Sequence, residues 1–131
     1  MAKRNRGLWE TYDRYIEAIA LNRRPITVAR YRYRLSDFIR HLKSTHRHLR
    51  SFCELRRRHI EGWLRYEASR KVPTTNSLLR KSTRRHNVIE VRHFLEELSA
   101  LGWEEAPPEG LFLRSDLAVA TLRRAPSEVI R

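Results

Sequence analysis

Two stretches of this sequence hold side chains with the chemistry of nucleic-acid recognition. The first contains Arg23, Arg24, Thr27, Arg30 and Arg34. The second contains Arg80, Lys81, Thr83, Arg84, His86 and Asn87. A guanidinium group is a planar donor that grips a phosphate, or the edge of a guanine, through two parallel hydrogen bonds. We expect phosphate contacts from the arginines of the first stretch and from Arg80, and base contacts from Thr83, Arg84, His86 and Asn87.

Helical spacing would place the first set on one ridge, because Thr27, Arg30 and Arg34 follow one another at steps of three and four residues. The second set differs, since residues 80–87 contain no apolar side chain. The sequence therefore predicts a helix end that faces no core and suits the major groove of a duplex. The alternative is an ordinary solvated helix end, capped by Ser82 and Thr83.

The charge of the chain is concentrated in one part of it. The 131 residues carry 28 Lys and Arg against 15 Asp and Glu, a formal net charge of +13 with neutral histidines. Residues 1–93 hold 24 of these cations and 8 of the acids, whereas residues 94–131 hold 4 and 7. Such a basic region is typical of a protein that binds a polyanion. A genomic bias toward arginine is the alternative, and it does not explain the asymmetry.

Other kinds of site are weakly supported. His41, His46, His48, Cys53 and His59 fall in one segment, but their spacing matches no common structural zinc pattern, so we expect no metal. The sequence has no glycine-rich phosphate loop, no Gly-x-Ser-x-Gly motif and no His-Glu-x-x-His motif. The tyrosines are better explained by packing than by nucleophilic catalysis. We expect no cofactor, no small-molecule substrate and no catalytic activity of the chain itself.

The cellular compartment is indicated by what the sequence lacks. Its single cysteine cannot form an internal disulfide, and its first residues lack the apolar run of a signal peptide. No apolar stretch approaches the length of a membrane-spanning helix. We therefore expect a cytoplasmic protein that does not bind membranes.

Apolar spacing predicts four helices that would position the basic residues. With only 4 Gly and 5 Pro, the chain favours long helices over a turn-rich sheet. Residues 8–21 repeat apolar side chains at steps of three and four, as an amphipathic helix does. A second helix is expected to start with Thr27 as its N-cap, and a third to end near Ser69. A loop at residues 73–77 then leads to a fourth helix that Gly102 stops.

The sequence also supports predictions for the start of the third helix and for the segment after the fourth helix. The basic run Arg56–Arg58 lies at the start of the third helix, where cations oppose the helix dipole. Either Glu54 and Glu61 or an external phosphate would offset it. After Gly102, residues 111–113 are expected to pack back onto the helices before the chain continues through residues 122–126.

The order and spacing of these helices resemble the amino-terminal part of tyrosine recombinases, the phage integrase family. Residues 27–42 fill every position of the family's Thr-x3-Tyr-x3-Leu-x2-Phe-x3-Leu helix. Residues 60–64 are similar to its next helix, and residues 82–95 to its fourth. Residues 108–126 resemble the connector into the catalytic domain, with Ala118 where a proline is usual. His86 stands where the family usually has an arginine.

The resemblance implies an all-α fold, a compact four- to five-helix orthogonal bundle called the SAM-like core-binding domain. Residues 1–105 would form this DNA-binding domain, and residues 106–131 a connector toward a catalytic domain that lies beyond the chain, which would then be a fragment of a recombinase. In the family such a domain clamps duplex DNA at the recombination site and does no chemistry itself. We expect double-stranded DNA as the partner, a monomer in isolation, and self-association on DNA for the whole recombinase.

Two other functions fit the composition. A small basic helical protein that binds structured RNA or ribosomes would carry the same charge, although the polar faces offer no aromatic platform for stacking single-stranded bases. A helical protein-interaction module with an acidic partner is the second alternative. For that module, the change Arg84→Ala would leave a weak affinity for duplex DNA unaltered.

Overall fold

The computed structural model describes residues 7–116, which fold into four α-helices and one short 3-10 turn. The α-helices are α1 (Leu8–Ala20), α2 (Pro25–Thr45), α3 (Arg57–Ser69) and α4 (Lys81–Ala100), and the 3-10 turn η1 (Phe52–Glu54) precedes α3. Within residues 7–116 the pairing of extended backbone is limited to an isolated bridge between Lys71 and Leu78. The prediction of an all-helical bundle is therefore confirmed.

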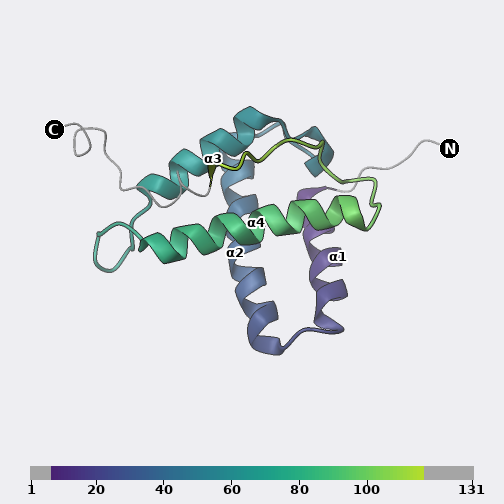
Figure 1. The fold of residues 1–131 in the computed structure, drawn as a ribbon, viewed down its shortest axis with the longest axis horizontal. Coiled ribbons are helices and arrows are strands. Elements are labelled where there is room, and N and C mark those ends of the chain that lie inside the picture. Colours follow the sequence, from purple (N-terminus) through teal and green to yellow (C-terminus); the bar gives the residue numbers. More distant parts are fainter. Residues whose placement is uncertain (1–6, 117–131) are drawn as a thin grey trace.

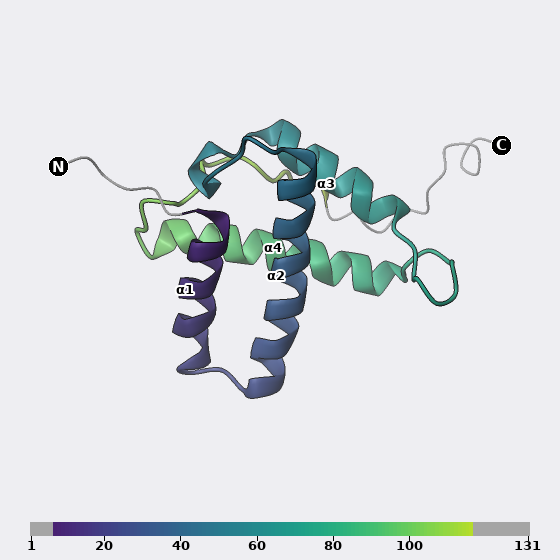
Figure 2. The same ribbon diagram turned by 180° about the vertical axis from the view of Figure 1, so that it is seen from behind.

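The helices are arranged as two pairs that cross (Figures 1 and 2). α1 and α2 lie side by side and run in opposite directions, joined by a short turn. α4 crosses this pair, and α3 runs back in the opposite direction to α4, to which residues 70–80 join it by a projecting hairpin loop. α2 contacts each of the other three helices.

The core lies where α4 crosses the other elements. Phe94 of α4 packs edge-on against Tyr15 of α1 and Phe52 of η1, with ring centroids 4.8 and 5.3 Å apart. Phe38 of α2 and Trp63 of α3 form a third edge-on pair at 5.0 Å. All five rings are buried, and edge-to-face pairs of this kind stabilise a core beyond the apolar area that they bury.

The start of α2 differs from the sequence-based prediction. Thr27 is not its N-cap, because the helix begins three residues earlier than predicted, at Pro25, with Arg24 in the N-cap position. Proline is favoured there since its fixed φ suits a helix and its missing N–H would have no partner. The predicted end of α4 is confirmed, because Gly102 takes a φ of 75° and donates its N–H to the carbonyl of Ser99 at 3.0 Å.

In the basic run at the start of α3, Arg57 is paired with acids of the protein itself. Arg57 donates to both carboxylate oxygens of Asp116, at 2.7 and 2.8 Å, and to Glu61 at 3.3 Å. Glu61 is one of the partners that the sequence suggested, whereas Asp116 is far away in sequence. This pairing accounts for Arg57 without an external phosphate.

Residues 102–116, which we call the strap, pack back across the helices. Leu111 is only 6% exposed and Phe112 packs against the core, as predicted, whereas Leu113 is exposed. The carbonyl of Leu111 also accepts a hydrogen bond from Arg57 at 2.7 Å. The strap is thus held by apolar packing and by the Arg57–Asp116 bridge. Residues 117–131, with the expected continuation of the connector, lie outside the described residues.

Candidate nucleic-acid interface

A groove lies between the first half of α2, the first half of α4 and the hairpin loop that precedes α4. We call it the α2–α4 groove. Its volume is about 310 Å³, and it is lined by Ile26, Ala29, Arg30, Tyr33, Arg34, Arg70, Leu79, Thr83 and Asn87. Four of the predicted site residues, from two distant stretches of the sequence, therefore lie around one concavity: Arg30, Arg34, Thr83 and Asn87.

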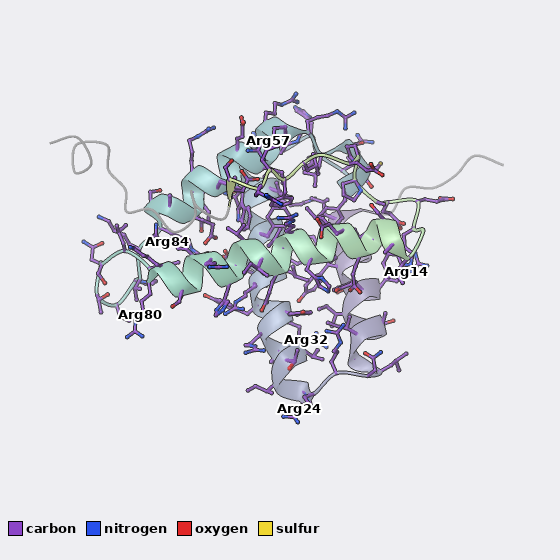
Figure 3. The ribbon with its side chains drawn as sticks, in the orientation of Figure 1. Arg14, Arg24, Arg32, Arg57, Arg80 and Arg84 are labelled. Atoms are coloured by element: carbon purple, nitrogen blue, oxygen red, sulfur yellow. The ribbon has the colours of Figure 1, made fainter. Side chains whose placement is uncertain are left out.

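Exposed cations lie on both sides of this groove. From the point where α2 and α4 cross, the first half of α2 runs to Arg24 and the first half of α4 runs to Arg80, so these two residues lie at the far ends of a V (Figure 3). Arg24, Arg30, Arg80 and Lys81 are all exposed, as is Arg85, which the sequence reasoning did not include among the site residues. The V therefore presents positive charge along both of its arms.

Not every predicted ridge residue is free at the surface. The guanidinium of Arg34 donates to Glu90 of α4 at 2.5 Å, and both side chains are largely buried. Arg34 thus ties α2 to α4 at the wall of the groove. Arg23 and Thr27 are half-buried at the start of α2, and neither lines the groove.

A buried polar network forms the base of the groove. Glu67 of α3 is 1% exposed and accepts hydrogen bonds from Asn87 Nδ2 at 2.9 Å and from Arg70 at 2.7 Å. Arg70 also pairs with Asp37 of α2 at 2.8 Å. Burial raises the pKa of Glu67, although the hydrogen bonds from Asn87 and Arg70 oppose this rise. The network joins α2, α3 and α4 through side chains that satisfy one another.

Two predicted base-contacting residues belong to the interior instead. Arg84 is 2% exposed and lies between α4 and α3 (Figure 3), where it donates to the carbonyl of Ala68 at 3.4 Å. Asn87 is 7% exposed and held by Glu67. The expectation that residues 80–87 face no core is therefore wrong at these two positions. A polar surface of α3 takes the place of an apolar core, which hydrophobic periodicity does not detect.

The remaining predicted residues of α4 are accessible. His86 and Lys81 are exposed, and Thr83 is half-buried on the groove wall. The sequence reasoning missed the five other residues that line the groove: Ile26, Tyr33, Ala29, Arg70 and Leu79. Ile26 and Tyr33 could have been recognised from the sequence as surface residues, because both lie off the apolar stripe of α2 that Val28, Leu35 and Phe38 define.

Negative charge near the groove is neutralised by internal pairs. Glu90 is paired with Arg34, and Asp37 with Arg70. No acidic residue occurs between Glu67 and Glu90 in the sequence, while Arg80, Lys81 and Arg85 are exposed there. A partner that meets this face therefore encounters cations with little opposing charge.

The histidine segment has its own structural explanation. His59 Nδ1 accepts a hydrogen bond from the N–H of Arg56 at 2.8 Å and so caps the start of α3. Burial, with a contribution from His46, lowers the pKa of His59, and the two rings pack edge-on at 4.5 Å. Within residues 7–116, no group of three or more His, Cys, Asp or Glu is placed to hold a metal ion. No helix in this range is long and apolar enough to cross a membrane.

A helical bundle with a groove rimmed by cations is typical of small helical domains that bind polyanions. The comparison with protein families is more specific. Residues 12–102 match the model of the phage integrase N-terminal SAM-like domain, and the chain belongs to this family, as its motifs indicated. Domains of this kind generally bind DNA. No curated protein and no solved structure matches the chain.

Proposed function

We propose that this protein is the core-binding domain of a site-specific tyrosine recombinase and clamps duplex DNA through the α2–α4 groove. The V of α2 and α4 faces the duplex, with Arg24, Arg30, Arg80 and Lys81 on phosphates along both arms. Thr83 and His86 are the candidates for base edges in the major groove. In this proposal Arg84 and Asn87 hold α4 against α3, so that Thr83 and His86 face the duplex.

One observation carries the proposal. Two distant basic stretches meet at a single groove of a domain that belongs to the integrase SAM-like family, and the acids near that groove are internally paired. A duplex offers two rows of phosphates on either side of a groove, which suits cations on two divergent arms. The domain supplies binding in this proposal, while strand cleavage belongs to another domain of the recombinase.

Fluorescence anisotropy with matched double-stranded DNA and double-stranded RNA, at several salt concentrations, tests the proposal. Neutralising about six phosphates would give a slope of log K against log salt on the order of −5. The change Arg30→Ala removes one contact and should make the slope shallower by about 0.9. Arg47→Ala is the matched control, because Arg47 is an exposed arginine beyond the other end of α2.

The outcomes separate this proposal from its alternatives. Tighter binding to DNA than to RNA, weakened by Arg30→Ala and not by Arg47→Ala, supports it. Equal or tighter binding to RNA favours an RNA- or ribosome-binding protein. Weak binding to both duplexes that neither variant changes favours a protein-interaction module.

We also propose that the protein is a monomer without DNA, and a stable tetramer in sedimentation without DNA would contradict this.

A further inference from the structure

Two large apolar side chains are exposed in the α2–α4 groove, and the core does not account for them. Ile26 and Tyr33 are 69% and 63% exposed. They lie seven residues apart on α2, so they share one side of the helix, with Ala29 between them. Leu79 lines the groove from the hairpin loop. A single exposed apolar residue needs no explanation, but this set forms an apolar lining inside a basic rim.

The basic rim and the apolar lining of the groove together indicate what kind of partner it binds. The rim carries Arg24, Arg30 and Lys81, which attract a polyanion, while the acids close by are paired internally. A duplex presents phosphates on both sides of its major groove, and the apolar group on the floor of that groove is the 5-methyl group of thymine. The duplex thus matches both the charge of the rim and the apolar character of the lining.

We infer that Ile26 and Tyr33 recognise thymine methyl groups and give the groove a preference for thymine at the base steps that α2 crosses. This inference rests on the proposed function, in which the groove faces duplex DNA. Seven residues of helix span about 10 Å, or roughly three base steps of 3.4 Å. Ile26 and Tyr33 would therefore reach methyl groups about three steps apart, while Arg30 contacts the phosphate between them.

The test compares two duplexes that differ only in the methyl group. Alternating poly(dA-dT) and alternating poly(dA-dU) have the same phosphates and the same hydrogen-bonding edges, but uracil lacks the 5-methyl group. The protein should bind the thymine duplex about 3- to 10-fold more tightly, as expected for one or two buried methyl groups. The variants Ile26→Ala and Ile26→Ala with Tyr33→Ala should reduce this ratio toward one, mainly by weakening binding to the thymine duplex.

A matched control is available on α4. Ile89 is an exposed isoleucine that does not line the groove, so Ile89→Ala should leave the ratio unchanged. Circular dichroism checks that each variant is folded, which we expect because the altered side chains are exposed. Equal affinity of the unaltered protein for both duplexes, or an equal loss of the ratio with Ile89→Ala, overturns the inference and leaves the proposed function standing. Absence of binding to either duplex at low salt overturns both.

Discussion

At the scale of single residues, the basic and polar side chains in the first half of α4 fall into two groups, one buried against α3 and one exposed to solvent. Arg84 and Asn87 point inward to α3, whereas Lys81, Arg85 and His86 point to solvent. The two inward residues match buried acceptors, the carbonyl of Ala68 and the carboxylate of Glu67. Substitutions only a few residues apart on one helix should therefore affect different properties of the protein.

Asn87→Ala should lower the free energy of unfolding by about 1–3 kcal/mol, because a buried carboxylate loses a hydrogen bond. Urea denaturation followed by circular dichroism measures the change. His86→Ala is the control, since His86 is exposed on the adjacent position, and it should stay within about 0.5 kcal/mol of the unaltered protein. Equal stability of Asn87→Ala and the unaltered protein would show that the hydrogen bond between Asn87 and Glu67 contributes nothing.

The bridge between Arg57 and Asp116 should make part of the stability depend on acid pH. Burial alone would raise the pKa of Asp116, but hydrogen bonds from Arg57 and from the N–H of Leu113 hold it below its usual value. The bridge therefore stabilises the fold above the unfolded-state pKa of about 3.9 and ceases to do so as pH falls through the lower, folded-state pKa.

Asp116→Asn should accordingly lose about 1–3 kcal/mol of stability at pH 7. The difference from the unaltered protein should shrink as the pH is lowered below about 3.9. Urea titrations at a series of pH values check this expectation. A difference that stays constant down to pH 2 would mean that the charge of Asp116 is not what stabilises the strap.

At the scale of elements, the hairpin loop between α3 and α4 depends on one unusual backbone conformation. Asn76 has a φ of 59° and donates its N–H to the carbonyl of Val72 at 2.7 Å, while Val72 donates to Ser77. Asparagine tolerates this left-handed region better than other residues with a side chain, and β-branched residues tolerate it poorly. The loop brings Leu79 to the wall of the α2–α4 groove, so its shape affects the groove.

Asn76→Val should therefore lower the free energy of unfolding by about 1–2 kcal/mol, and Asn76→Gly should leave it nearly unchanged. Thermal unfolding of both variants measures the difference. Because Asn76 is exposed, lost packing does not account for a large effect of valine. Identical melting curves for the two variants would contradict the role of the positive φ.

The elements themselves were largely predictable from the sequence, because each helix carries an apolar stripe. Gly102 and the loop at residues 73–77 were recognisable from residue types that break helices. The first half of α4 was not, since its partners, the carboxylate of Glu67 and the backbone carbonyl of Ala68, are polar groups of another helix. Periodicity detects the burial of apolar side chains, whereas the burial of Arg84 depends on a pairing that only the folded chain brings about.

At the scale of the whole molecule, the sequence predicted which basic stretches form the candidate interface, but not how their side chains are arranged around the groove. The sequence identified both basic stretches, and Arg30 and Thr83 do line one groove. It did not predict that Arg34 would pair with Glu90, nor that Ile26 and Tyr33 would be exposed there. Those details depend on where α2 and α4 cross, which no local pattern specifies.

The charge of the described molecule is also uneven in space. Cations line the V of α2 and α4, whereas several exposed acids, Glu96, Glu104 and Glu109, lie at the end of α4 and along the strap. A duplex would be attracted to the first region and repelled by the second, so charge should favour binding through the V over binding through the strap. Raising the salt concentration should therefore slow association more than it speeds dissociation.

The strap affects where this chain can be cut without losing the fold. A chain shortened after residue 105 would lack Leu111 and Asp116, uncover Leu95 on α4, and leave Arg57 without its bidentate partner. We expect it to melt at a lower temperature than a chain that ends after Asp116.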